Sequence, residues 1–129
     1  MKRKLKNNFK DNRGSIIDIF TNEPKDHCTI VTFNRYAVRG NHFHKKSTQY
    51  SFIISGKLKM VTARVDKKGH ITGKITKEIV TQNTLIEHKP YCAHAFKALK
   101  NSNLLAFVNG KRGGKNYEKD TFRLKTKLI

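Results

Sequence analysis

The chain lacks the long apolar runs and the apolar leader that mark membrane and secreted proteins. No segment approaches the ~18 consecutive apolar residues that a transmembrane helix requires. Residues 1–10 are basic and contain no apolar stretch of the kind found in a signal peptide. We therefore expect a cytoplasmic protein without membrane contact.

Cysteine is also scarce. The only two, Cys28 and Cys92, are far apart and form no C-x-x-C pair. This spacing argues against a disulfide framework and against a structural zinc site. The simplest interpretation is two free thiols in a reducing compartment.

Acidic residues are few. Nine Asp and Glu face 28 Lys and Arg, which gives a formal net charge of +19. The lysines are spread along the whole chain, whereas a nucleic-acid site usually clusters arginine and aromatic side chains on one face. The sequence therefore argues against specific nucleic-acid binding, although a positive field would help to capture an anionic small molecule such as a nucleotide sugar.

Helical periodicity is missing, and short β-branched and aromatic runs take its place. At 129 residues the chain suits one domain. We predict strands at residues 14–20, 28–33, 49–54, 58–65, 71–80, 84–88, 93–99, 103–109 and 120–126. Strands at this spacing indicate an all-β barrel or sandwich. We place the domain at residues 11–129 and expect residues 1–10 to be a basic, flexible segment.

The strongest chemical signal is the segment Arg39-Gly-Asn-His-Phe-His-Lys-Lys-Ser-Thr-Gln49. His42 and His44 are two residues apart, so on a strand both imidazoles lie on one face while Phe43 points the other way. Two inward-facing histidines can bind a metal or act as a general acid and base. The Gln49 amide could join them from the following strand.

A second signal lies in residues 83–96. Pro90 comes four residues before His94, and an apolar run follows. This pattern predicts a turn that leads into a strand beginning near His94. In a closed barrel His94 could meet the first pair of histidines.

Together the two segments resemble the signature motifs of the cupins, G-x5-H-x-H-x3,4-E-x6-G and a second motif with a proline and a third histidine. The positions that fit are His42, His44, Gln49, Gly56, Pro90 and His94. Glutamine replaces the usual glutamate, and Gly40 lies too close to His42 to be the leading glycine. The resemblance covers roughly residues 11–126 and implies a single-domain, all-β jelly-roll barrel of the RmlC-like cupin superfamily.

Three sugar-modifying branches of the cupins are similar to this chain. The run from Arg39 to Gln49 resembles the nucleotide-sugar 3,4-ketoisomerases, where glutamine follows histidines that move protons. Arg39-Gly-Asn-His42 and Asp11-Asn-Arg-Gly14 resemble stretches of the dTDP-4-dehydrorhamnose 3,5-epimerases, where that histidine is the base. Residues 39–44 look equally like the C-terminal cupin of capsular polysaccharide reductases, which holds a metal.

The resemblance implies an isomerase or epimerase for a nucleotide-linked (dTDP-type) 4-keto-6-deoxysugar in surface polysaccharide or deoxysugar biosynthesis, without a redox cofactor. It implies His42 and His44 as the catalytic residues. The implied substrate-binding residues are Arg39, Arg13, Gln49 and Tyr91. The amide of Gln49 favours proton transfer, because an amide is a weaker, neutral metal ligand than a carboxylate. The sequence does not choose among Tyr36, Tyr50 and Tyr91 as a second acid.

Two alternatives remain open. In the first, the chain is a metal-binding cupin that acts as a small-molecule enzyme or sensor, with one divalent ion (Zn, Fe, Mn or Ni) held by His42, His44, Gln49 and His94. In the second, it is a non-catalytic sugar-binding module. The sugar-modifying cupins also imply a homodimer.

Overall fold

The computed structural model describes residues 1–110 and 119–129, and these residues form strands joined by turns and loops. In chain order the strands are β1 (Lys2–Lys4), β2 (Phe9–Asp11), β3 (Gly14–Ile16), β4 (His27–Phe33), β5 (Val38–Phe43), β6 (Gln49–Ser55), β7 (Lys57–Arg64), β8 (Thr76–Thr81), β9 (Thr84–His88), β10 (Cys92–Ala98), β11 (Ser102–Val108) and β12 (Phe122–Arg123). Within this part of the chain there is no helix with the length and apolarity needed to cross a membrane.

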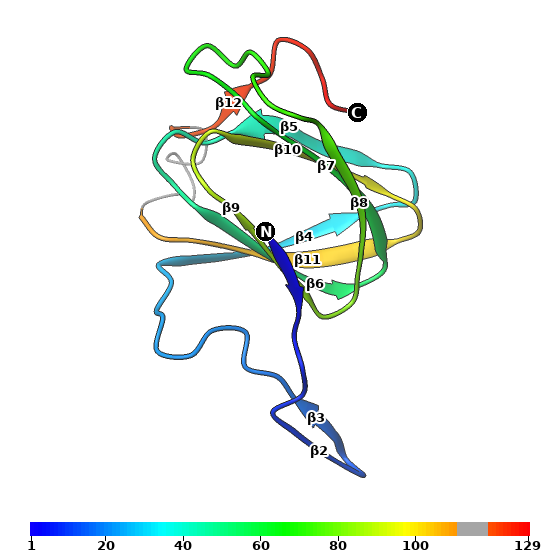
Figure 1. Cartoon of the computed structure of the whole chain (residues 1–129). Coiled ribbons are helices and arrows are strands. Elements are labelled where there is room, and N and C mark those ends of the chain that lie inside the picture. The colour runs from blue at the N-terminus through cyan, green and yellow to red at the C-terminus, as the bar shows by residue number, and fades with distance from the viewer. Residues whose placement is uncertain (111–118) are drawn as a thin grey trace.

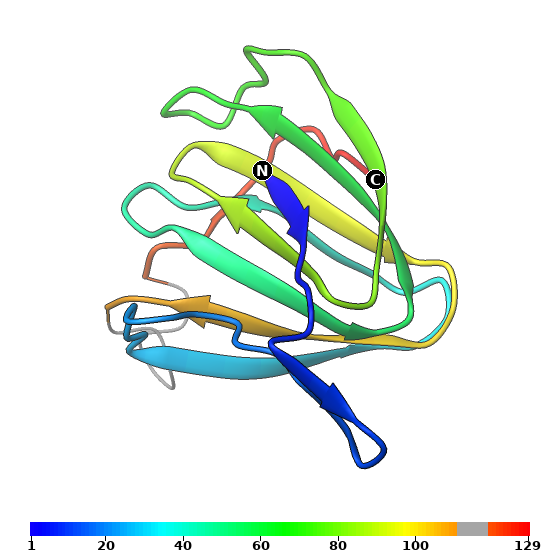
Figure 2. The same cartoon turned by 60° about the horizontal axis from the view of Figure 1, so that its bottom comes forward.

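Two five-stranded antiparallel sheets face each other and enclose the interior (Figure 1). One sheet has the order β1-β9-β6-β11-β4, and the other has the order β12-β5-β10-β7-β8. The hairpin of β2 and β3 projects away from both sheets, as the turned view in Figure 2 also shows. The predicted all-β, single-domain jelly-roll cupin is therefore confirmed.

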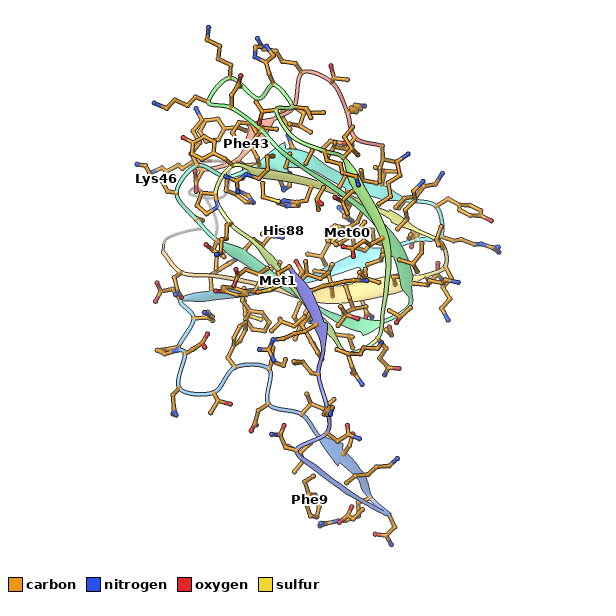
Figure 3. All side chains as sticks on the ribbon, viewed as in Figure 1. Met1, Phe9, Phe43, Lys46, Met60 and His88 are labelled. Carbon is orange, nitrogen blue, oxygen red and sulfur yellow. The ribbon has the colours of Figure 1, made fainter. Side chains whose placement is uncertain are left out.

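The main core fills the space between the two sheets, because strand alternation sends every second side chain inward. Its buried residues are Phe33, Ile53, Leu58, Met60, Val80, Ile86, Phe96, Ala98 and Leu104. Burying a side chain of this size contributes about 1.5–3 kcal/mol. In Figure 3 Met60 and His88 lie between the sheets, while Phe43 lies on the outer side of β5. The core therefore holds the sheets together and leaves one end of the interior to polar side chains.

Most predicted strands are present within two residues of their expected ends, but three are shorter. β8 begins at Thr76 instead of residue 71, since only Ile71 forms an isolated bridge before it. β3 ends at Ile16 because its only partner, β2, has three residues. β12 has two residues, paired with the end of β5.

The first ten residues contain a strand that composition did not indicate. Lys2–Lys4 pair with β9 from Thr84 to Ile86 and form an edge of the first sheet. The side chains of β1 are exposed, and two of them also contact β8: Lys2 lies 3.5 Å from the Glu78 carboxylate, and Lys4 donates to Thr81 Oγ1 at 2.8 Å. The domain boundary at residue 10 stays a prediction, although β1 is part of the sheet.

Candidate active site

Three histidines that are distant in sequence converge at one end of the interior. β5 and β10 pair antiparallel with His94 directly opposite His42. The ring centroids are 4.8 Å apart for His42 and His94, 5.1 Å for His42 and His44, and 5.5 Å for His44 and His94. One nitrogen from each ring lies within 4.8 Å of the others. The structure thus brings together the three predicted imidazoles.

A β-bulge explains why an arginine three residues before His42 shares its face. The register between β5 and β10 shifts, so that Ala95 opposes Gly40 while its neighbour His94 opposes His42. Asn41 is the extra residue, with a φ of 57°. A bulge adds one residue to a strand, so two side chains that are three positions apart can lie on the same face. Arg39 therefore lines the same cavity as His42.

Glycine is required at position 40 for two reasons. Its φ is 98°, a conformation that other residues rarely adopt. A Cβ atom at this position would also lie 2.7 Å from the carbonyl oxygen of His94. The close approach of the two strands that sets His42 against His94 therefore depends on the missing side chain.

Hydrogen bonds to backbone carbonyls orient two of the rings. His44 Nδ1 lies 2.6 Å from the carbonyl oxygen of Asp120, and His94 Nδ1 lies 3.1 Å from that of Cys92. A carbonyl oxygen can only accept a hydrogen bond, so each Nδ1 carries the proton and each Nε2 is the acceptor nitrogen.

His42 has the opposite arrangement. Arg123 on β12 pairs directly with His42 across the sheet, and its Nη1 lies 3.2 Å from His42 Nδ1. Arginine can only donate, so this Nδ1 is an acceptor. Neutral His42 then carries its proton on Nε2.

The side-chain amide of Gln49 faces His44. Its oxygen lies 3.2 Å from His44 Nε2, and its nitrogen lies 3.3 Å from Ser51 Oγ. Two acceptors face each other in this orientation because His44 Nδ1 already carries the proton. Either a half-turn of the amide, which lets its NH2 group donate to His44, or a cation between the two atoms resolves the contact.

Asp120 connects the site to the loop that follows β5. Its carboxylate accepts hydrogen bonds from the backbone N–H groups of Lys45, Lys46 and Ser47 at 2.8–3.2 Å. Burial alone would raise the pKa of Asp120, but the hydrogen bonds from this loop lower it below its usual value. Asp120 therefore fixes the loop with its side chain and His44 with its carbonyl.

A cavity of about 330 Å³ opens beside these histidines. Its polar wall is formed by Arg39, His42, His94 and Arg123 of one sheet, and Gln49 reaches it from the other sheet. The opposite wall is mostly apolar and comes from β4 and β11, with the side chains of Val31, Phe33, Leu104, Ala106 and Val108. The volume lies within the range of small-molecule sites. His44 does not line this cavity, so its predicted catalytic role remains a prediction.

Two predicted substrate contacts lie elsewhere. Arg13 is in the turn of the projecting hairpin, bound to Asp11 at 2.6 Å, with an 80% exposed side chain. Tyr91 packs on Phe43, whose side chain is on the opposite face of the sheet from His42. Both residues lie in turns, and neither side chain reaches the cavity. Neither Tyr36 nor Tyr50 lines the cavity.

The sequence analysis missed two histidines. His27 on β4 lines the cavity, and its Nε2 lies 2.7 Å from Thr29 Oγ1. His88 is 1% exposed and stacks on His94 with centroids 4.2 Å apart. Neither ring nitrogen of His88 has a hydrogen-bond partner among the described residues. The sequence did contain a signal for His88: it lies two residues after Ile86 on a strand, so the two side chains share the inward face.

The three converging imidazoles fit a metal ion in part. Metal-binding histidines usually donate their second nitrogen to a carbonyl or carboxylate oxygen, and His44 and His94 both do so. His42 differs, because Arg123 donates to its Nδ1 and leaves the proton on Nε2. A metal would therefore fit His44, His94 and the Gln49 oxygen, and would need His42 to change its tautomer.

Comparison with known proteins gives one family match and several similar folds. A family model described as the polysaccharide biosynthesis C-terminal domain matches residues 9–122. No curated protein matches the sequence.

Three solved structures illustrate the likeness. The dTDP-4-dehydrorhamnose 3,5-epimerase from Sulfolobus tokodaii has a TM-score of 0.72 and 21% identity, over 88% of this chain and 70% of that one. The sugar 3,4-ketoisomerase QdtA from Thermoanaerobacterium thermosaccharolyticum, in complex with TDP, has a TM-score of 0.76 and 16% identity, over 97% and 88%. The capsular polysaccharide assembling protein CapF from Staphylococcus aureus has a TM-score of 0.67 and 18% identity, over 95% of this chain but only 33% of its own length. At these identities the likeness shows a shared fold.

Proposed function

This chain belongs to the polysaccharide biosynthesis C-terminal domain family, and from that premise we propose that it isomerises or epimerises a nucleotide-linked 4-keto-6-deoxysugar by histidine acid–base chemistry. The observation that carries the proposal is the pairing of His42 and His94 in the wall of the cavity. Similar folds named as epimerases and ketoisomerases, one of them bound to TDP, support the choice of substrate class.

The cavity can accept a sugar ring but is too small for a whole nucleotide sugar. Its volume of about 330 Å³ lies at the lower end of the range for ligand sites. We place the sugar between the imidazoles and the apolar wall, and the nucleotide outside. Arg39, exposed beside the cavity and held by a bond from its Nε to the Thr32 carbonyl, would then bind the diphosphate or the enediolate charge.

The proposed reaction moves protons between neighbouring carbons. One imidazole removes the proton from C3, an enediol forms, and proton delivery at C4 leaves a 3-keto sugar. A neutral imidazole is a suitable base near pH 7, since the pKa of free histidine is about 6.5. The reaction needs no redox cofactor. A cytoplasmic location and a homodimer remain predictions.

Hydrogen exchange tests this proposal. With a dTDP-4-keto-6-deoxyhexose in deuterium oxide, we expect the protein to add deuterium at C3 or C4, or to form the 3-keto isomer, far faster than buffer alone. Proton NMR of the sugar ring follows both events. Exchange at the buffer rate with several such nucleotides would refute the proposed activity, and nucleotide binding without exchange would favour the non-catalytic sugar-binding module.

A metal-binding cupin is the second candidate function. The observation that favours it is the contact between two acceptors, His44 Nε2 and the Gln49 oxygen, which a cation would relieve. The bond from Arg123 to His42 opposes it, so we retain proton transfer as the leading proposal.

Metal analysis separates these two candidates. Under the proton-transfer proposal, protein purified without chelator should contain almost no Zn, Fe, Mn or Ni, and dialysis against EDTA should leave the exchange rate unchanged. Near one metal per chain, together with loss of activity on chelation, would support the metal-binding alternative. Elemental analysis by mass spectrometry gives the stoichiometry directly.

A further inference from the structure

Arg123 contacts the candidate site, but neither sequence motif includes it. It is the second residue of β12, 81 residues away from His42 in the sequence and directly opposite it in the sheet. Its Nη1 lies 3.2 Å from His42 Nδ1 and 3.4 Å from the carbonyl oxygen of Gly40. The guanidinium is thus held at the ring by two acceptors of β5.

His42 and His94 have opposite tautomers, and the contact with Arg123 determines that of His42. Arg123 donates to His42 Nδ1, so the proton of His42 is on Nε2. The Cys92 carbonyl accepts from His94 Nδ1, so Nε2 of His94 is an acceptor. The two rings are 4.8 Å apart at an interplanar angle of 85°. One neutral ring therefore offers a proton donor beside the proton acceptor of the other.

We propose that Arg123 is a positioning residue that holds His42 as the Nε2–H tautomer, and that His42 is thereby the proton donor and His94 the base. The inference rests on the proposed function for its chemistry, since it assigns the two roles within that reaction. The contact itself is a property of the protein without substrate.

The first half-reaction uses both rings. His94 Nε2 takes the C3 proton, and the electron pair of the broken C3–H bond forms the C3–C4 double bond. The π pair of the C4 carbonyl moves to O4, which takes the proton from His42 Nε2. A neutral imidazole can act in this way beside an enediolate, and the positive charge of Arg123 at Nδ1 stabilises the negative charge left on the ring.

The second half-reaction returns both rings to their starting state. His42 Nε2 takes the proton of O3, and the O3 electron pair forms the new carbonyl at C3. The C3–C4 double bond takes the proton held by His94 and becomes the C4–H bond. The 4-keto sugar has become a 3-keto sugar, and no proton is gained or lost. Two rings of the same tautomer would lack either the donor or the acceptor.

Nitrogen NMR of the histidine side chains tests the tautomer without substrate. In the wild-type protein we expect the His42 proton on Nε2 and the His94 proton on Nδ1. In Arg123→Leu the signals of His42 should shift toward a mixture of the two tautomers, while Arg123→Lys, which keeps a charged donor, should retain the wild-type pattern. Arg35→Leu is the matched control, since Arg35 is exposed and packs on Tyr36. A wild-type His42 with its proton on Nδ1 would overturn the inference, whatever the variants do.

Kinetics then test the consequence. For Arg123→Leu we expect kcat for isomerisation to fall about 10- to 100-fold, with a small change in KM and partial recovery in Arg123→Lys. A raised KM with an unchanged kcat would overturn the inference, because it would make Arg123 a substrate-binding group only. Absence of turnover in the wild-type protein would instead refute the proposed function. The tautomer measurement needs no turnover, so it tests the role of Arg123 separately.

Discussion

Replacing His94 by asparagine is expected to slow deuterium exchange into the keto sugar by about 10²–10⁴-fold, the usual contribution of a general acid or base. His94 lines the cavity, and its Nε2 is the acceptor nitrogen. Asparagine keeps a polar side chain of similar reach but provides no basic nitrogen. The rate of exchange at C3, followed by proton NMR under saturating nucleotide sugar, is the measurement.

His42→Asn should cause a loss of the same order, and His70→Asn should cause none. His70 is exposed in a turn, where its Nδ1 lies 3.2 Å from Asp66, so it controls for the loss of an imidazole anywhere in the chain. Each variant should still bind the nucleotide, because Arg39 is unchanged. A His42→Asn protein with full exchange activity would remove that residue from the reaction.

Replacing His88 by phenylalanine is expected to stabilise the protein. His88 is 1% exposed, and both of its ring nitrogens lack hydrogen-bond partners among the described residues. A buried polar group without a partner costs about 1–3 kcal/mol. Phenylalanine keeps the aromatic stack on His94 and removes this cost, less any overpacking from its larger ring. Chemical denaturation at pH 7 should show the increase in the free energy of unfolding.

The effect of His88 should grow as the pH falls. Burial, and then the charge of the nearby His94, hold the pKa of His88 well below its ordinary value of 6.5. The unfolded chain therefore binds a proton near pH 6.5 that the folded protein does not bind, so acid favours unfolding. Between pH 7 and pH 5 the wild-type protein should lose up to about 2 kcal/mol that the His88→Phe variant keeps. Equal losses in both proteins would show that His88 takes up a proton in the folded state.

The resemblance to the cupin motifs was sufficient for the fold and for the convergence of the three imidazoles, and short-range patterns indicated the strands involved. Side chains alternate between the two faces of a strand, which predicted His42 and His44 on one face and Phe43 on the other. Pro90, four residues before His94, indicated a turn that leads into the strand that carries the third imidazole. These local signals indicated the strands, whereas the meeting of the rings depends on the pairing of β5 with β10.

The rest of the site depends on strand pairing and could not be read from local patterns. The bulge at Asn41 brings Arg39 to the cavity, although its odd spacing from His42 would place it on the other face. Arg123 reaches the site only because the short β12 pairs with the end of β5. Tyr91 was predicted to bind substrate, but its φ of 61° belongs to a turn that leads its side chain to the outer cluster around Phe43.

The bulge at Asn41 also depends on residues that are synthesised much later in the chain. The Asn41 side-chain oxygen accepts hydrogen bonds from the backbone N–H groups of Leu128 and Ile129, the latter 88 residues further along the chain. Contacts over such sequence distances are slow to form and come late in folding. Residues 128 and 129 must therefore have been made before these two hydrogen bonds to the bulge at Asn41 can form.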